Sequence, residues 1–97
     1  MVVKTDSLPV TDGQDDHRVE LQCAVYLIPE VEGGYSVIAA HLPGAMSQGE
    51  TEAEALGNIT EALSGIVQSY REAQQDIPWE DVGRPEHAVS RMVTIHA

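Results

Sequence analysis

The segment from Tyr35 to Tyr70 constrains the fold of this chain more than any other part of the sequence. It begins with alternating apolar residues, breaks at Pro43-Gly44, and passes through a short extended piece to a helix start at Thr51. Proline and glycine together end a strand, because proline lacks an amide hydrogen and glycine accepts a positive φ. The order of these features predicts two consecutive strands followed directly by a long helix.

The helix is expected to run from Thr51 to about residues 74–76. Thr51 and Glu54 have capping-box spacing: the threonine hydroxyl would accept from the Glu54 N–H, and the Glu54 carboxylate would accept from the Thr51 N–H. Gly57 and Gly65 weaken a helix, and close packing against the sheet is the expected reason for their presence. Apolar residues recur at helical spacing and should form one buried stripe, made of Leu56, Ile59, Leu63, Ile66, Val67 and Tyr70.

Strands are expected on both sides of this segment. Residues 18–29 alternate with period two, and the sequence Glu32-Gly33-Gly34 supplies a hairpin turn. Residues 35–42 then return as the second strand, residues 45–49 form a third, and residues 88–96 form the last. The apolar face of the first strand would carry Val19, Leu21, Cys23, Val25 and Leu27.

These elements predict an α+β fold with a three-stranded antiparallel meander, one long helix and a final strand (β-β-β-α-β). If the helix runs back across one face, the last strand is parallel to the first, through a right-handed crossover. The expected strand order is 3-2-1-4, and placing the last strand beside the third is the alternative. One helix covers only one face, so the other is an expected oligomer or partner interface. That face would carry Tyr26, Ile28, Ile38 and Met92.

The length and charge of the chain limit its class. Its 97 residues suit a single domain over residues 18–97, preceded by an acidic segment, residues 1–17, that we expect to be disordered. Sixteen acidic residues against five basic ones give a net charge of −11, which argues against binding nucleic-acid phosphates. This charge favours a basic partner or simply solubility. Because so small a core is thin, association into a homodimer or tetramer is expected to help stabilise it.

No catalytic or cofactor-binding arrangement is recognisable in the sequence. Cys23 lies in an apolar run and should pack as a small hydrophobic residue, and the four histidines lack metal-ligand spacing. A two-metal nuclease needs several converging carboxylates, and Glu20 is the only acid within the predicted strands. We therefore expect no enzymatic activity, no metal and no cofactor.

The sequence also gives no sign of a membrane or export role. No apolar stretch approaches the ~20 residues that a membrane span needs. The N-terminus lacks the charged and then apolar pattern of a signal peptide. A cytoplasmic location is therefore expected.

Three short motifs resemble the HicB antitoxin family, and with their continuations they extend from Gly33 to Pro78, about half of the chain. They are Gly33-Gly34-Tyr35, Leu42-Pro43-Gly44 and Gly49-Glu50-Thr51-Glu52-Ala53-Glu54-Ala55, and they continue with Asn58, Glu61-Ala62 and Ile77-Pro78. The resemblance implies a partial RNase H-like fold. It also implies a protein that binds and silences a small, basic, RNA-cleaving toxin of the HicA type. The motif residues, expected to be mainly structural, are Gly33, Gly34, Tyr35, Leu42, Pro43, Gly44, Gly49, Thr51, Glu54 and Ala55.

Two departures from the family pattern bear on function. Family members commonly carry a further C-terminal DNA-binding segment, whereas this sequence stops after the last predicted strand, so DNA binding by this chain alone is not expected. His41 stands where many members have aspartate before Leu-Pro-Gly, and a lone histidine at a strand end is expected to be structural.

The leading hypothesis is therefore a non-catalytic, antitoxin-like binding protein. The alternatives are an orphan structural or regulatory oligomer without a toxin partner and, least supported, a metal-dependent RNase H-like nuclease.

Overall fold

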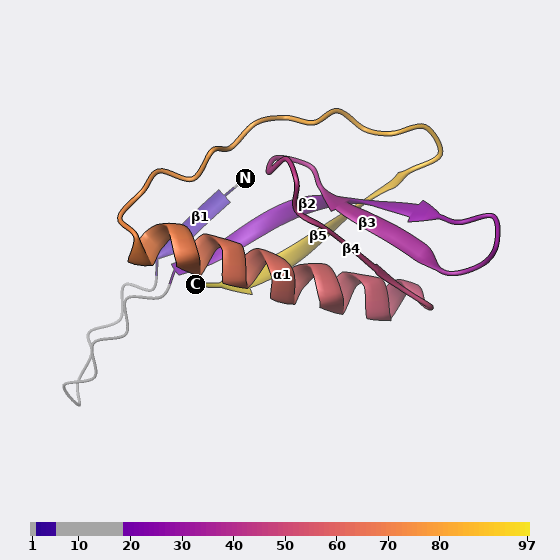
Figure 1. The fold of residues 1–97 in the computed structure, drawn as a ribbon, viewed down its shortest axis with the longest axis horizontal. Helices are drawn as coiled ribbons and strands as arrows, with labels where there is room; N and C mark the ends of the chain where they lie inside the picture. The colour runs from indigo at the N-terminus through magenta and orange to yellow at the C-terminus, as the bar shows by residue number, and fades with distance from the viewer. Residues whose placement is uncertain (1, 6–18) are drawn as a thin grey trace.

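Five strands and one helix are present in the computed structural model, which describes residues 2–5 and 19–97 (Figure 1). The predicted helix and the four predicted strands are all present, with bounds that differ from the prediction by a few residues. In chain order the elements are β1 (Val2–Thr5), β2 (Val19–Pro29), β3 (Tyr35–Ala39), β4 (Met46–Gly49), α1 (Glu52–Glu72) and β5 (Val89–His96).

The predicted strand order is confirmed. β3 pairs antiparallel with β2 and with β4, and β5 pairs with β2. Val25 of β2 lies opposite both Ala39 of β3 and Arg91 of β5, so the two neighbours occupy opposite edges of β2. The resulting order β4-β3-β2-β5 is the expected order 3-2-1-4.

The predicted orientation of the last strand is wrong. β5 runs antiparallel to β2, with Leu21 opposite Ile95 and Leu27 opposite Val89. The reason is the path of residues 73–88, which return along the length of the molecule to the end where α1 began (Figure 1). β5 therefore runs in the same direction as α1 and against β2, and no parallel crossover is formed.

β1 is a strand that the sequence analysis did not predict. It pairs antiparallel with the start of β2, with Val2 opposite Gln22 and Thr5 opposite Val19. Its residues belong to the segment 1–17, which was expected to be disordered. The remainder of that segment lies outside the described residues.

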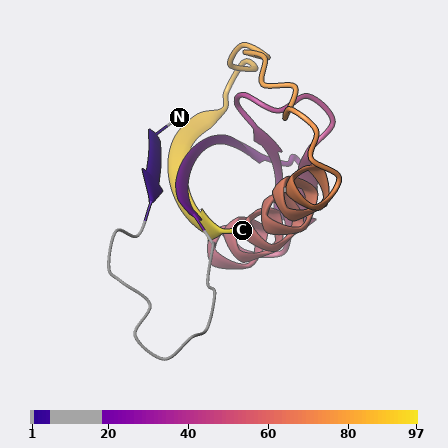
Figure 2. The ribbon, with the colours of Figure 1, turned by 90° about the vertical axis from the view of Figure 1, so that its left-hand side faces the viewer.

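The core lies between one face of the sheet and one stripe of α1. The helix packs on the concave side of the curved sheet (Figure 2). The expected alternation along β2 is confirmed for its described side chains, since Leu21, Cys23, Val25 and Leu27 are buried. The buried stripe of the helix is narrower than predicted: Leu56, Ile66 and Tyr70 are only partly buried. The buried helix residues are Ala55, Ile59, Leu63 and Val67, spaced four apart.

The helix begins with a capping box that differs from the prediction by one residue. The Glu54 N–H donates to the Thr51 hydroxyl at 3.1 Å, as expected. The Glu54 carboxylate accepts from the N–H of Glu50 at 3.1 Å, where Thr51 was predicted as the donor. The first bond satisfies an amide group that a helix start leaves without an intrahelical partner, and the second ties the Glu54 side chain to the residue before the cap.

Replacing Thr51 with alanine is expected to lower the free energy of unfolding by ~0.5–2 kcal/mol, because the cap acceptor is lost. Thr51→Ser retains the hydroxyl and should stay close to the wild type. Urea denaturation of the three proteins measures the difference. Equal stability of the alanine and wild-type proteins would contradict the cap.

The predicted role of Gly57 and Gly65 is wrong. Both residues are exposed, and a Cβ atom at either position would meet no atom within 4 Å. Neither glycine is therefore required for packing against the sheet.

We expect Gly57→Ala and Gly65→Ala each to raise the free energy of unfolding by up to ~1 kcal/mol, because alanine loses less backbone entropy in a helix. Thermal and urea denaturation of the single variants check this. A loss of stability in both variants would show that the two glycines are needed for packing after all.

Candidate functional site

Half of the family-motif residues line one open hollow, where the β2–β3 turn meets the start of α1. These five are Gly33, Gly34, Tyr35, Gly49 and Glu54. The hollow measures ≈ 340 Å³. Its other lining residues are Glu30, Ser36, Gln48, Glu50 and Asn58, which give it a polar wall with three carboxylates.

The glycines of the β2–β3 turn form one rim of this hollow. Gly33 and Gly34 have φ values of +103° and +77°, a region that favours glycine. The Gly33 N–H donates to the Glu30 carbonyl, and the Glu30 N–H donates to the Gly34 carbonyl, both at 3.0 Å. The turn therefore closes a hairpin and holds the Glu30 backbone at the edge of the hollow.

Gly49 brings the end of β4 directly against the first turns of α1. A Cβ atom on Gly49 would lie 2.4 Å from the backbone nitrogen of Ala55, closer than any real contact. The side-chain amide of Asn58 donates to the Gln48 carbonyl at 2.7 Å and joins the helix to the same strand. Gly49 and Asn58 thus fix the wall of the hollow where strand and helix meet.

Two of the three carboxylates of the hollow are already hydrogen-bonded within the protein. The Ser36 hydroxyl donates to the Glu30 carboxylate at 2.6 Å, and the Glu54 carboxylate accepts from the backbone N–H of Glu50 at 3.1 Å. Over residues 2–5 and 19–97 no group of three or more His, Cys, Asp or Glu side chains is placed to hold a metal ion. The hollow can accept hydrogen bonds from a polar or cationic group.

The remaining motif residues lie elsewhere in the fold. Leu42 and Ala55 are buried in the core, and Thr51 caps the helix. Pro43 and Gly44 are exposed in the β3–β4 turn, where Gly44 has φ +90°. The structure therefore divides the motif between two chain reversals, the core and the helix start.

The four residues predicted for the uncovered sheet face do share it. Tyr26 lies opposite Ile38, and Met92 lies opposite Ala24, at the positions that alternate with the buried ones. Met46 lies opposite Ile38 on the same face, and the sequence analysis missed it. The alternation of residues 45–49, with Met46 and Gln48 on one side, could have revealed it.

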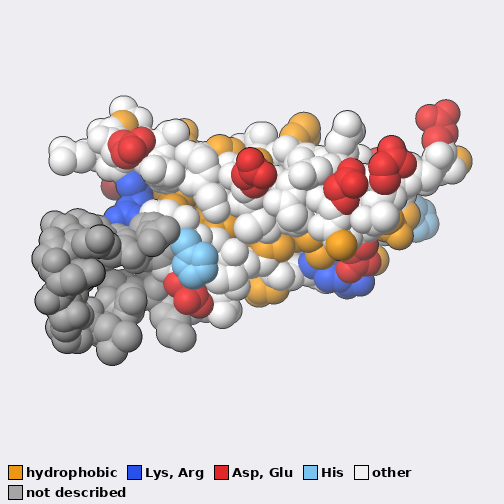
Figure 3. Space-filling view, turned by 90° about the horizontal axis from the view of Figure 1, so that it is seen from below, with side chains coloured by type: hydrophobic (Ala, Val, Ile, Leu, Met, Phe, Trp, Pro, Cys, Tyr) orange, Lys and Arg blue, Asp and Glu red, His pale blue; other side chains and the backbone are white. Residues whose placement is uncertain are grey.

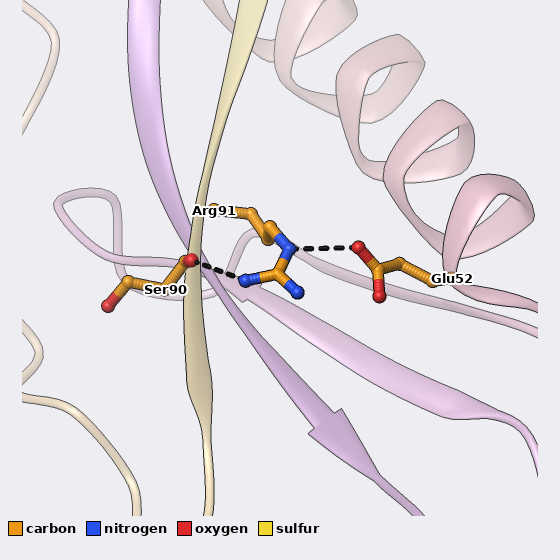
Figure 4. Close-up of polar contacts among 3 residues, drawn as sticks. All are labelled: Glu52, Ser90 and Arg91. Atoms are coloured by element: carbon orange, nitrogen blue, oxygen red, sulfur yellow. Dashed lines mark hydrogen bonds and ion pairs between the residues drawn. The ribbon is translucent and has the colours of Figure 1, made fainter.

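An ion pair that was not predicted joins β5 to the start of α1 (Figure 4). The Arg91 Nε donates to the Glu52 carboxylate at 2.8 Å, and Arg91 Nη1 donates to the Ser90 carbonyl at 3.0 Å. The hydrogen bond and charge of Glu52 raise the pKa of Arg91 above its ordinary value. Both side chains are partly exposed to solvent, so the ion pair adds little to the stability of the fold and mainly orients the two side chains.

Cys23 and His41 are two residues with potentially reactive side chains that lie outside the family motif. Cys23 is a free thiol buried in the core, and burial raises the pKa of this thiol, which disfavours the reactive thiolate. The Nδ1 atom of His41 is buried and has no hydrogen-bond partner among the described residues. The His41 backbone carbonyl accepts from the Glu80 N–H at 2.9 Å and so anchors the loop that leads to β5.

Acidic side chains lie at intervals along the whole length of the molecule on the side shown in Figure 3, beside a band of hydrophobic side chains. On α1 the acids are Glu52, Glu54, Glu61 and Glu72. Within the part of the chain that the structure describes, no helix is both long and apolar enough to cross a membrane.

Sequence comparison connects the chain to a family. No protein-family model matches it. A UPF0150 protein of Synechocystis sp. is 41% identical over 58 residues, which cover 60% of this chain and 73% of the relative. A UPF0150 protein of Thermoplasma acidophilum is 30% identical over 77 residues, which cover 79% of this chain and 100% of the relative. Antitoxin HicB of Escherichia coli K12 is 43% identical over 54 residues, which cover 56% of this chain and 39% of the antitoxin.

Structural comparison agrees with these relationships. The crystal structure of the N-terminal domain of the Burkholderia pseudomallei antitoxin HicB matches with a TM-score of 0.59 and 28% identity. The match covers 75% of this chain and 95% of that domain. The chain therefore belongs to the UPF0150 family and is a HicB-like protein with the fold of the HicB N-terminal domain.

Proposed function

We propose that this chain is a non-catalytic, antitoxin-like protein that sequesters a small, basic, RNA-cleaving toxin of the HicA type. The observation that carries the proposal is the joint match in sequence and fold to HicB antitoxins. The motif residues shape turns, a helix cap and a close strand–helix contact, so their roles are structural and recognition of a partner is left to the surfaces of the fold.

The charge distribution supports a basic partner. Exposed carboxylates recur along α1, at Glu54, Glu61 and Glu72, in a chain with a net charge of −11. A toxin that cleaves RNA needs positive charge to hold phosphates, and an acidic protein competes for the same surface. The mechanism proposed is steric and electrostatic occlusion of that surface. Because cellular RNA is the toxin's substrate, the site of action proposed is the cytoplasm.

Co-expression with the product of the adjacent reading frame tests the proposal. We expect a small basic protein to co-purify with the tagged chain and the chain to restore growth that this protein inhibits. Adding the purified chain should also stop RNA cleavage in vitro, with an affinity that falls as salt rises. An unrelated acidic protein of similar size and charge is the control. Continued RNA cleavage at saturating amounts of the chain would refute the antitoxin role.

A structural or regulatory oligomer without a toxin is the second candidate function. It is favoured by the Thermoplasma acidophilum relative, which aligns over 100% of its length and is named only as a UPF0150 protein. Absence of any captured basic protein, together with a stable oligomer of the chain alone, would select this candidate. RNA cleavage by the chain alone with Mg²⁺ or Mn²⁺ would refute the non-catalytic part of both proposals.

A further inference from the structure

An open groove lies along one side of α1, where the helix passes β4. It measures ≈ 660 Å³, and the helix contributes Ala62, Gly65 and Ile66 as its apolar lining. From Asn58 to Ser69, which also line it, the helix rises roughly 16 Å, or about three turns. The other lining residues are Ser47 and Glu61. These dimensions suit one short helix lying alongside α1.

Gly65 keeps the middle of this groove open. Apart from the helix's own backbone, a Cβ atom on Gly65 would meet no atom within 4 Å. Ala62 and Ser69, about one turn away on either side, are also small. Packed helices lie ~8–10 Å apart, depending on the side chains at the contact. The three small residues therefore let another helix approach α1 at the short end of that range.

The charges around the groove are negative. Glu61 lines it directly. Asn58 lines both the groove and the hollow beside the β2–β3 turn, so the two openings adjoin. The carboxylates of the hollow are those of Glu30, Glu50 and Glu54. Among the described residues that line either opening, none is Lys or Arg. This surface therefore attracts a basic partner and disfavours a second copy of the same acidic chain.

We propose that the groove receives an amphipathic helix of a basic partner, with its apolar stripe against Gly65 and a Lys or Arg side chain in the hollow. A helix docked in this way makes contact through apolar residues at positions i, i+3 or i+4, and i+7. Glu54 precedes Gly65 by roughly 16 Å along α1, so the cation lies about three turns from the contact at Gly65. The natural occupant rests on the proposed function, in which a small basic toxin supplies this helix.

A synthetic peptide tests the groove without a toxin. The probe is a helical peptide of leucine and lysine, about five turns long, with its leucines in one stripe. Its counterpart carries glutamate in place of every lysine. Titrated into the isotope-labelled chain at low salt, the lysine peptide should shift the amide NMR signals of Ala62, Gly65 and Ser69 most, followed by those of Gly33 and Gly34. The glutamate peptide should shift none of them.

Gly65→Leu fills the groove, and Gly57→Leu is its matched control. Both variants place leucine at an exposed glycine of α1, and leucine favours helix at each position. Gly57 lines neither the groove nor the hollow. Gly65→Leu should weaken binding of the lysine peptide at least ~10-fold, whereas Gly57→Leu should change it less than ~2-fold. Thermal melting shows that each variant is folded.

Three results would overturn the proposal. The first is a lysine peptide that does not bind, or that shifts the signals of Tyr26 and Met92 on the opposite sheet face. The second is equal affinity of the Gly65→Leu and Gly57→Leu proteins for this peptide. The third is equal binding of the lysine and glutamate peptides, since charge would then play no part.

The toxin assay separates this proposal from the proposed function. If the chain fails to stop RNA cleavage but binds the lysine peptide through Gly65, the antitoxin role is refuted and the docking groove stands. If the chain stops cleavage and Gly65→Leu stops it equally well, the antitoxin role stands and the groove is not the toxin's contact.

Discussion

Replacing Gly49 with alanine is expected to lower the free energy of unfolding by about 3 kcal/mol, at the upper end of overpacking effects. The added Cβ would lie 2.4 Å from the Ala55 nitrogen, 2.8 Å from the Glu54 carbonyl carbon and 2.9 Å from the Ala55 Cα. All three are backbone atoms of the helix, so no side-chain rotation relieves the overlap. The helix start must move away from β4, and the Asn58–Gln48 hydrogen bond is lost with it. Urea denaturation measures the loss.

Gly57→Ala is the matched control, because it adds the same methyl group on α1 itself, where apart from the helix's own backbone no atom lies within 4 Å. We expect opposite signs for the two variants, with Gly49→Ala destabilising and Gly57→Ala stabilising. A Gly49→Ala protein within roughly 0.5 kcal/mol of the wild type, the usual range of surface substitutions, would show that β4 and α1 do not approach so closely.

Local sequence patterns predicted the elements well because each pattern has one physical cause. Alternation from Leu21 to Leu27 identified the buried face of β2, and Thr51 with Glu54 identified the start of α1. The direction of β5 could not be predicted this way. It depends on the path of residues 73–88, which are polar and lack periodicity, and on which edge of β2 remains free.

Tertiary contacts explain the other errors. Gly49 and Gly57 look alike in sequence, yet one lies against a helix backbone and the other faces open space. The ion pair between Arg91 and Glu52 depends on the register of β5, which no local pattern specifies.

The candidate site was predicted only in part. Resemblance to a family identified five motif residues of the hollow, and the segments that carry it also contain Glu50 and Asn58, whereas polar neighbours such as Ser36 and Gln48 carried no signal of their own. They became recognisable once the β3–β4 register placed them opposite each other.

Truncating Leu63 to alanine is expected to cost ~2–5 kcal/mol of unfolding free energy, the range for large-to-small changes in a core. Leu63 is 0% exposed and lies one turn from Ile59 and one turn from Val67 in the buried stripe of α1. A domain of 97 residues has a total stability of roughly 5–15 kcal/mol, so this change would remove a large share of it. Thermal and urea denaturation should both show the loss.

Glu61→Ala is the control for Leu63→Ala, since Glu61 is exposed two residues away on the same helix and its removal should have little effect. The comparison separates loss of packing from a general effect on helix formation, because alanine favours helix at both positions. Equal stability of the two variants would mean that Leu63 does not face the sheet. The helix would then be rotated about its axis, the Gly49–Ala55 contact would be lost, and the hollow beside the β2–β3 turn would have no wall.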